Sequence, residues 1–485
     1  MKKTKKLLFT LVSSALIATS VAPMASCATG NNTPSGNVNA VAYDGSAVTV
    51  TFYHTMGEKL REVLNTYIPD FNAMYPNITI DHQAMGGYPD LRDQISTELT
   101  AGNSPSMAYC YPDHVALYNK AKAVATLDNF IALEGTATKA DGTTEQMGFT
   151  DTQLGDFVKG YYDEGKEFGD GLMYTLPYSK STEVLYYNKT YFTENNLQVP
   201  TTWDEMKTLC QTIKAKEGSE VIPLGYDSES NWFITQCEQR GLGYTTATKG
   251  ELFKFNTADH QAFMAEFREW YEAGLVTTGE ISTFSYTSKL FTKTTGQRCY
   301  MSIGSSGGAS NQCPQQVTNE DGTTSYPFEV GVAMIPQYNK DNQKVISQGP
   351  SLCMFKKSEQ EMAATWLFMK FLTTYVPLQA NFSQASGYSA VINSVTENEN
   401  YANFLANADG NARLTALAIK QAQTEAHQKA LFVSPAFDGS SAARDVVGQL
   451  VQDCVLKELE GKTAAQLIAG LFDDAIDELE YDYGS

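Results

Sequence analysis

A short glycine- and serine-rich run, Gly304 to Gly308, holds the residue types best suited to chemistry in this chain. It matches the G-x-S-x-G pattern, in which a serine nucleophile, here Ser306, stands on a sharp turn. Such a hydrolase also needs a downstream histidine, and the only later one, His427, lies in a stretch of helical composition. A secreted serine esterase is therefore a remote hypothesis. The run can instead bind a phosphate or a sugar hydroxyl through its backbone N–H groups, or it is simply a tight turn.

Arg444 is the expected partner of any anionic ligand group. It lies on a predicted helix together with Val446, Val447 and Leu450. On such a helix an arginine either covers apolar surface with its stem or acts as a buried fork for a carboxylate or phosphate. The guanidinium can bind a phosphate through two parallel hydrogen bonds, which lysine cannot.

Aromatic side chains can stack on a sugar ring or pack around a choline-like headgroup. The candidates are Tyr88, Tyr111, Tyr178, Tyr388 and Trp232. Each tyrosine is equally an ordinary half-buried packing residue. Asp113 can accept hydrogen bonds from the hydroxyls of a polyol, or it is a solvated residue at the start of a helix.

The sequence predicts no metal and no cofactor. It has no H-E-x-x-H, no Walker sequence, no C-x-x-C and no Cys/His cluster. One pair, such as Cys299 and Cys313, is compatible with a disulfide, although spacing does not establish it, and the other cysteines are expected in the core. The seven cysteines beyond Cys27 are Cys110, Cys210, Cys237, Cys299, Cys313, Cys353 and Cys454.

Composition and charge exclude several classes of protein. The chain has 485 residues, 42% of them hydrophobic, which is enough for a large core and more than one domain. Its 35 basic and 55 acidic residues give a net charge of −20, which argues against a nucleic-acid binder that relies on a basic surface. We expect a globular, acidic, monomeric protein.

The N-terminus has the pattern of an export signal. Residues 1–26 begin with four lysines within the first six positions and continue with a short apolar run. The sequence Ala25-Ser26-Cys27 resembles a bacterial lipobox, which predicts lipidation of Cys27, a flexible tether over residues 27–42, and attachment to the outer face of the cytoplasmic membrane. The alternative is an ordinary signal peptide cut near Ser26. No later stretch is apolar enough to span a membrane.

The remaining pattern is that of a parallel α/β protein. A strand over 48–53, a helix over 60–74 and a strand from 78 form a β-α-β unit, and similar alternation continues to residue 226. From residue 413 onward the sequence is helical. We expect two α/β lobes around a cleft, with chain crossings near Leu176-Pro177 and Gly349-Pro350 and a helical C-terminal tail. The expected lobes are residues 43–176 plus 302–350 and residues 177–301 plus 351–485.

These motifs together resemble the extracellular solute-binding proteins of bacterial ABC importers. The general marks are FNAMYPNITI (71–80), GNSPS (102–106), VLYYN (184–188), VPTTWDEM (199–206) and WLFMKFL (366–372). The glycerol-3-phosphate-binding branch is the most similar, through FYHTM (52–56), CYMSIGSSGG (299–308), GVAMIP (331–336), Ser386-Gly387-Tyr388 and the tail from Arg444 to Lys462. The resemblance implies a two-lobed binding protein, not an enzyme, that delivers its ligand to membrane permease subunits.

The resemblance also implies ligand contacts and a ligand class. The contacts are Tyr88, Ser181, Ser306, Gly349, Tyr388 and Arg444, with Trp232 as a stacking or lid residue. The implied ligand is glycerol-3-phosphate or a glycerophosphodiester. The chain departs from the branch at two places. The branch has an acidic residue directly after the tyrosine of its third strand, whereas here Pro112 separates Tyr111 from Asp113. Lys180, just before Ser181, also differs from the branch. A neutral sugar or oligosaccharide therefore remains the alternative ligand.

Overall fold

The computed structural model describes residues 38–282 and 284–484. Its first sheet forms around the predicted N-terminal β-α-β unit. β1 pairs in parallel with β2 and β3, and β15 runs antiparallel to β3 and β6. In spatial order the strands are β2 (Ile78–Ala84), β1 (Val48–His54), β3 (Met107–Cys110), β15 (Ser351–Met354) and β6 (Thr175–Pro177).

Helices that pack on the first sheet bury one large apolar core. The first of them ends at Met74, in agreement with the helix predicted over 60–74, and it contains Pro69 in its interior. These helices are α1 (Glu58–Met74), α2 (Tyr88–Ala101), α3 (Pro112–Asn119), α12 (Glu359–Thr374) and α13 (Val376–Ser386).

The second sheet is built around the long strand β7, which pairs antiparallel with β10, β13 and β14. Its strands are β16 (Leu431–Phe432), β14 (Val345–Gln348), β7 (Ser181–Asn188), β10 (Met301–Ser305), β8 (Leu224–Tyr226), β9 (Val276–Thr278) and β13 (Val330–Met334). The accompanying helices are α7 (Lys189–Glu194), α8 (Trp203–Glu217), α9 (Glu229–Arg240), α10 (Ala258–Glu272) and α11 (Ser288–Phe291). A capping box of Thr202 and Glu205 begins α8.

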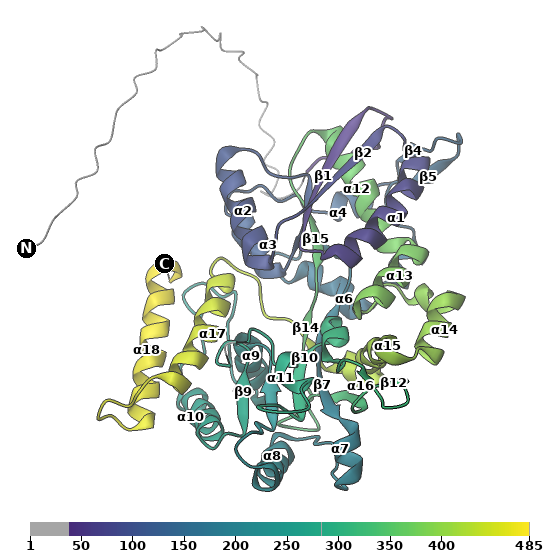
Figure 1. Cartoon of the computed structure of the whole chain (residues 1–485). Helices are drawn as coiled ribbons and strands as arrows, with labels where there is room; N and C mark the ends of the chain where they lie inside the picture. The colour runs from purple at the N-terminus through teal and green to yellow at the C-terminus, as the bar shows by residue number, and fades with distance from the viewer. Residues whose placement is uncertain (1–37, 283, 485) are drawn as a thin grey trace, which may run out of the picture. The chain divides into compact units, whose positions relative to one another are not determined.

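The C-terminal part is helical, as expected. Its last two helices, α17 and α18, pack into the core of the second sheet (Figure 1). The helices are α14 (Glu399–Asn407), α15 (Gly410–Ala422), α16 (Glu425–Ala430), α17 (Ser440–Leu456) and α18 (Ala464–Tyr483). Among the described residues, no helix combines the length and apolar character needed to cross a membrane.

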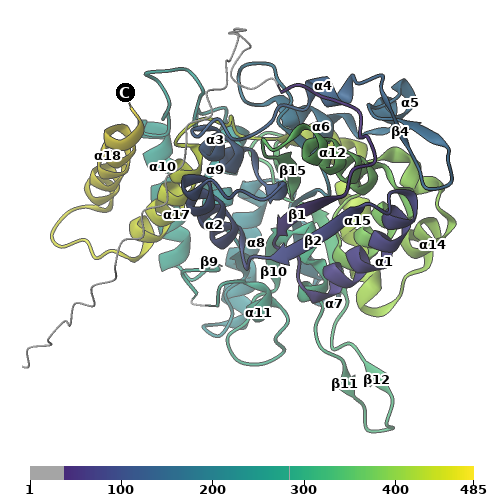
Figure 2. The ribbon, with the colours of Figure 1, turned by 90° about the horizontal axis from the view of Figure 1, so that it is seen from above.

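Short elements complete the chain. Asp141 and Asp321 each lie in the loop of a two-stranded hairpin, and Figure 2 shows the second hairpin projecting outward. The elements are α4 (Asp128–Ile131), β4 (Thr136–Thr138), β5 (Thr144–Gln146), α5 (Asp151–Asp156), α6 (Lys159–Asp163), β11 (Val317–Thr318) and β12 (Thr324–Ser325), with 3-10 turns at Glu164–Lys166, Ser306–Gln312 and Asn393–Glu397.

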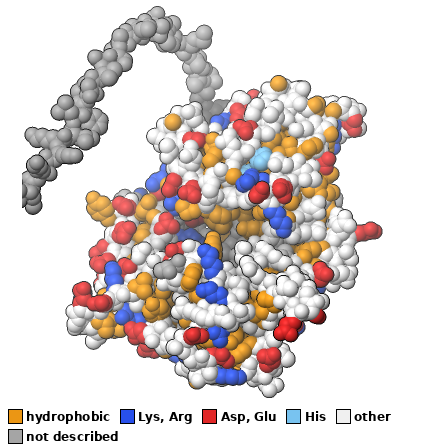
Figure 3. Space-filling model, viewed as in Figure 1, with side chains coloured by type: hydrophobic (Ala, Val, Ile, Leu, Met, Phe, Trp, Pro, Cys, Tyr) orange, Lys and Arg blue, Asp and Glu red, His pale blue; other side chains and the backbone are white. Residues whose placement is uncertain are grey.

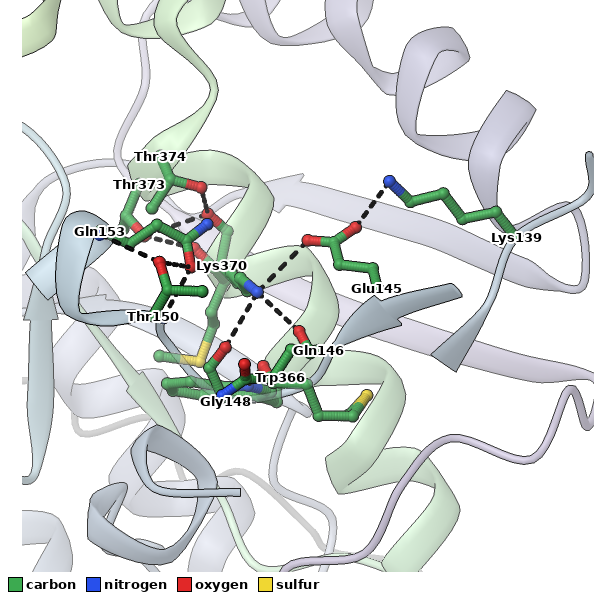
Figure 4. Close-up of polar contacts among 12 residues, drawn as sticks. Lys139, Glu145, Gln146, Gly148, Thr150, Gln153, Trp366, Lys370, Thr373 and Thr374 are labelled. Atoms are coloured by element: carbon green, nitrogen blue, oxygen red, sulfur yellow. Dashed lines mark hydrogen bonds and ion pairs between the residues drawn. The ribbon is translucent and has the colours of Figure 1, made fainter. Parts of the chain in front are cut away.

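Figure 4 shows how a buried lysine ties the hairpin β4–β5 to α12. Lys370 donates from Nζ to the carbonyl oxygens of Gln146 at 2.7 Å and Gly148 at 3.0 Å. Its ion-pair partner is Glu145 Oε1 at 3.3 Å, and the other oxygen of this carboxylate meets Lys139 at 2.9 Å. Because the buried ammonium group of Lys370 is paired with both carbonyl oxygens and a carboxylate, the lysine serves as a structural anchor.

The sheets divide the chain differently from the lobe boundaries expected above. The segment 302–350 was expected in the first lobe, but β10 pairs with β7 and β8, so the chain stays with the second sheet at residue 302. The segment 351–485 was expected in the second lobe. β15 and α12 instead join the first sheet and its core, whereas α17 and α18 pack with the second sheet as expected. The chain therefore does cross between the two sheets at Gly349-Pro350. It passes from the second sheet to the first, whereas the expected lobes required a passage from the first to the second.

The two predicted crossings lie against each other. The first runs from β6 to β7 through residues 178–180, and the second runs from β14 to β15 through Gly349 and Pro350. Gly349 has φ +95°, and a Cβ on it would lie 2.9 Å from Lys180 Cα. Only glycine tolerates this backbone and this close approach, so the crossing point depends on its identity.

Candidate ligand-binding cleft

A cavity of about 70 Å³ lies beside the crossings, between the parts built on the two sheets. Tyr111 and Asp113 reach it from the end of β3 and the start of α3, and Arg444 reaches it from α17. Lys180 and Gly349 line it from the crossings themselves. In Figure 3 the surface is hollowed between the upper part, on the first sheet, and the lower part.

A second hollow of about 590 Å³ involves the glycine- and serine-rich run. Tyr388, from the segment after α13, lies directly on the backbone of Gly307, because a Cβ there would lie 2.7 Å from Tyr388 Cζ. Asp227 and Tyr286 line the same hollow. Small residues in this run therefore serve the close approach of an aromatic ring.

Arg444 is held in place by a chain of buried hydrogen bonds. Its Nη2 donates to Asn231 Oδ1, and Asn231 Nδ2 donates to Glu183 Oε1 at 2.9 Å. The hydroxyl of Tyr226 donates to the other oxygen of Glu183. Burial raises the pKa of Glu183 to about 7, against the lowering effect of the hydrogen bonds from Tyr226 and Asn231 and of the positive charge on Arg444. One N–H of the guanidinium is thus used for orientation, and its others can face the cavity.

Lys180, the residue that departs from the family pattern, is already paired. Its Nζ lies 2.5 Å from Glu164 Oε2 and 3.0 Å from Ser351 Oγ, with only 1% of the residue exposed. The hydroxyl of Ser347 donates to the other oxygen of Glu164. A buried charge that is fully paired contributes little net attraction for a ligand. Arg444 is the other cation in the lining, and it forms no ion pair within the described residues.

Three tyrosines gather at the first-sheet side of the cleft. Tyr88 stacks on Tyr111 with ring centroids 4.3 Å apart and an interplanar angle of 29°. Desolvation raises the pKa of Tyr111, with a further contribution from nearby Tyr388, and burial raises the pKa of Tyr388 to about 12. These hydroxyls stay protonated near neutral pH and can donate hydrogen bonds to a ligand.

The two serines among the predicted contacts are buried, and neither belongs to the lining of the cavity or of the second hollow. Ser306 is fully buried, and its Oγ accepts from the backbone N–H of Thr182 at 3.3 Å. Ser181 is 3% exposed and pairs with Gln348 of β14. His427 Nε2 lies 2.9 Å from Thr182 Oγ1, so both members of the supposed esterase pair bind Thr182. Within the described residues, the serine–histidine bond that an esterase needs is not formed.

Trp232 lies apart from the other predicted residues. Although it is next to Asn231 in sequence, its ring packs on Phe267 with centroids 4.0 Å apart, on the α10 side of α9. Tyr178 is also buried, against Phe382. The structure therefore brings Asp113, Gly349 and Arg444 to the cavity, and Tyr88 and Tyr388 to its neighbourhood.

Other predictions concern cysteines. Cys299 and Cys313 are free thiols, as are the remaining cysteines that the structure describes, and all of these except Cys313 are buried. Cys27 lies outside the described residues. Among residues 38–282 and 284–484, no group of His, Cys, Asp and Glu side chains could hold a metal ion.

Two residues of the cleft were not anticipated from the sequence. Asn231 and Glu183 orient Arg444, yet neither belongs to a recognised motif. Glu183 does leave a signal, because it is a charged residue directly before the apolar strand sequence VLYY. A carboxylate is rarely fully buried without a specific partner, so that position marks a polar network.

Comparison with known proteins agrees with this architecture. The sequence model of the bacterial extracellular solute-binding protein family matches residues 66–409. The sn-glycerol-3-phosphate-binding periplasmic protein UgpB of Escherichia coli K12 is 25% identical over 374 residues, which cover 73% of this chain and 75% of that protein. The protein of the same name from Salmonella typhimurium is 24% identical over 385 residues, covering 76% and 80%.

Solved structures share the fold. UgpB of Mycobacterium tuberculosis, in complex with glycerophosphocholine, superposes with a TM-score of 0.64 at 16% identity, over 90% of this chain and 99% of that one. The GacH receptor of Streptomyces glaucescens, studied unliganded and with acarbose, gives 0.66 at 16% identity over 90% and 99%. These findings confirm both the two-lobed fold and the family resemblance. The chain belongs to the bacterial extracellular solute-binding proteins, the ligand-binding components of ABC importers.

Proposed function

We propose that this protein captures glycerol-3-phosphate or a glycerophosphodiester and delivers it to the permease of an ABC importer. The observation that carries the proposal is Arg444, oriented through Asn231 toward the cavity between the lobes. Within the described part of the chain only one N–H of this guanidinium has a side-chain acceptor, so the others are suited to bind two phosphate oxygens.

The neighbouring groups suit the rest of such a ligand. Asp113 lines the same cavity and can accept hydrogen bonds from the glycerol hydroxyls. The stacked pair of Tyr88 and Tyr111 offers an aromatic face to a choline-like substituent on the phosphate. The names of the sequence relatives, which are glycerol-3-phosphate-binding proteins, support the same ligand class.

Closure of the two lobes would couple binding to transport. The cavity takes side chains from both sheets, so a ligand that bridges Tyr111 and Arg444 favours the closed arrangement over the open one. The closed, loaded protein is then the form that the permease would receive. We infer that it acts as a monomer, because the cleft is formed within one chain.

A neutral sugar or oligosaccharide is the second candidate ligand. It is favoured by the larger hollow of about 590 Å³ with Tyr286 and Tyr388 on its wall, which has room for more than one sugar ring. The GacH receptor and the maltose-bound MalE3 of Thermotoga maritima, with TM-scores of 0.66 and 0.65, show that the fold accommodates such ligands.

A thermal-shift panel separates the two candidates. The panel contains glycerol-3-phosphate, glycerophosphocholine, glycerol, maltose and maltotriose, each tested on the wild-type protein and on Arg444→Ala. We expect the phosphorylated ligands to raise Tm and the variant to lose this response. A response to the maltodextrins that Arg444→Ala retains would favour the sugar hypothesis instead.

We also propose that Cys27 carries the lipid that anchors the mature protein. The sequence Ala-Ser-Cys after an apolar run supports this. Growth with labelled palmitate should label the full-length protein and leave Cys27→Ala unlabelled and released from the membrane fraction. Equal membrane association of the two proteins would contradict the proposal.

A further inference from the structure

A pocket separate from the cleft lies between α8, α9 and α10. It measures about 300 Å³ and is lined by three of the chain's four tryptophans, Trp203, Trp232 and Trp270. We call it the tryptophan pocket. Its volume is at the lower end of the range of small-molecule sites, which are mainly lined by apolar and aromatic side chains with a few polar groups.

The walls of the tryptophan pocket are aromatic. Trp232 packs on Phe267 and Phe263 with ring centroids 4.0 Å and 5.6 Å away, and each of these rings is less than one-tenth exposed. Leu224 and Val276, from neighbouring parallel strands, also line the pocket. A planar carbon ring can contact such walls without losing hydrogen bonds to water.

Charged side chains of opposite sign surround the pocket. Glu266 Oε1 lies 3.0 Å from Lys207 Nζ, and its Oε2 lies 3.7 Å from Arg240. The guanidinium of Arg240 also lies over the ring of Tyr338, 4.4 Å from its centroid. Because these long side chains neutralise one another, the rim gives no strong preference for a charged ligand and can rearrange without backbone movement.

Two buried hydrogen-bond donors in the lining residues have no acceptor in the described part of the chain. They are Trp270 Nε1 and Gln236 Nε2, in residues that are 7% and 2% exposed. Arg240 Nε donates to Gln236 Oε1 at 3.2 Å, which holds the amide with its NH₂ group unpaired. By contrast, Trp203 Nε1 donates to Gln239 Oε1 at 2.8 Å.

Unpaired buried donors need an explanation, because each costs about 1–3 kcal/mol relative to a paired one. Both donors here belong to residues that line one pocket, and both lack the same thing, an acceptor. A molecule that enters the pocket and carries an acceptor atom would supply the missing partner. Because Gln236 Nε2 and Trp270 Nε1 are both buried in this structure, a small side-chain shift is needed to expose them to that acceptor.

We propose that the tryptophan pocket binds a small aromatic molecule that carries a hydrogen-bond acceptor such as a carbonyl oxygen. A monosaccharide fits less well, because its several hydroxyls would each need partners, while Glu266 is already engaged by Lys207 and Arg240. The proposal does not depend on which ligand the cleft takes.

The tryptophans themselves report on occupancy. Labelling with 5-fluorotryptophan gives one ¹⁹F resonance for each of the four residues, and the fourth, Trp366, is buried in the core of the first sheet and serves as an internal control. The protein is titrated with acetophenone, which has a carbonyl acceptor, and with ethylbenzene, which lacks one. We expect acetophenone to shift the resonances of Trp203, Trp232 and Trp270, to leave that of Trp366 unchanged, and to bind about tenfold more tightly than ethylbenzene.

Two variants and one control variant make the test specific. Gln236→Leu keeps the volume of the side chain and removes one donor, so it should reduce the preference for acetophenone, whereas Gln384→Leu on α13 should not. Val276→Phe should abolish binding of both probes by filling the pocket. Three results would overturn the proposal: equal affinity for the two probes, a shift of the Trp366 resonance as large as those of the other three, or displacement of acetophenone by glucose. If Val276→Phe does not fold, Gln236→Leu still tests the proposal.

Discussion

Glu183 gives the protein a pH dependence that can be isolated. The residue is 1% exposed and its pKa is raised to about 7 from the usual 4.5, so the folded state holds a proton that the unfolded state releases between these values. Its contribution to stability is therefore complete below about pH 4.5 and is lost as pH rises through 7. This difference between the two pKa values corresponds to about 3 kcal/mol in the free energy of unfolding.

The corresponding variant is Glu183→Gln, which mimics the protonated form. The free energy of unfolding of this variant, relative to wild type, should increase by about 3 kcal/mol between pH 4.5 and pH 8. Urea unfolding at both pH values measures it, with the exposed Glu425→Gln on α16 as the matched control. An equal change in both variants would show that Glu183 titrates normally.

The buried pair of Lys180 and Glu164 predicts a second residue-level effect. Lys180→Met leaves Glu164 buried without its cation, which typically costs about 3–5 kcal/mol. The double variant with Glu164→Gln should recover part of the loss, because no unpaired charge remains. A loss of only about 1 kcal/mol in chemical denaturation, as for an exposed pair, would contradict this account.

The predictability of the site differs from residue to residue. Arg444, Gly349 and Asp113 were anticipated from the sequence, and all three line the cavity. Trp232, which the resemblance implies as a stacking or lid residue, lines a different pocket, because consecutive helical residues point about 100° apart and Asn231 is the one that contacts Arg444. Hydrogen-bond partners distant in sequence, such as Glu183, depend on tertiary packing that a single sequence does not display.

At the level of elements, α2 and α17 make a contact that joins the two parts of the cleft. Arg92 Nη1 on α2 lies 3.0 Å from Asp445 Oδ2 and 3.0 Å from Ser441 Oγ on α17, the helix that carries Arg444. This contact can exist only when the lobes are close together. It therefore favours the ligand-holding arrangement.

Arg92→Ala should weaken ligand binding about two- to fivefold, since Asp445 is 65% exposed and such pairs contribute about 0.5–1 kcal/mol. Asp445→Ala should have a similar effect, and the double variant should be no worse than either alone. Calorimetric titration of the cleft ligand gives all four constants. Fully additive losses would show that the two residues act separately.

Regular elements were the most predictable part of the structure. The helix over 60–74 corresponds to α1, and the capping box at Thr202 begins α8, because local sequence decides both features. The sheet that each later strand joins was not predictable in the same way. β10 and β15 differ little in local pattern, and their partners, β7 and β3, are far away in sequence.

For the whole molecule, the net charge sets the long-range field. The chain carries −20, and removal of residues 1–26, with four lysines and no acidic residue, would change this to −24. Figure 3 shows acidic side chains scattered over the visible face. Such a field repels an anionic ligand at a distance, so specificity for phosphate must come from local groups such as Arg444.

Salt should therefore accelerate capture of glycerol-3-phosphate. Screening of a negatively charged protein reduces its repulsion of a dianion, whereas glycerophosphocholine has no net charge and should show little change. Stopped-flow measurement of the association rate of both ligands tests this dependence on salt. The range from about 20 to about 300 mM salt covers Debye lengths above and below about 10 Å. A rate for glycerol-3-phosphate that falls with salt would indicate attraction by the protein's field.

The central claim is that Arg444 holds the phosphate of a polyol ligand in the cleft. Isothermal titration calorimetry with glycerophosphocholine and glycerol-3-phosphate tests it most directly, on wild type, Arg444→Gln and the control Arg413→Gln, whose side chain pairs with Glu329 on the surface. We predict saturable heat for wild type and for Arg413→Gln, and an affinity about 10- to 100-fold lower for Arg444→Gln. No heat with either ligand, or equal affinity in the two variants, would contradict the claim.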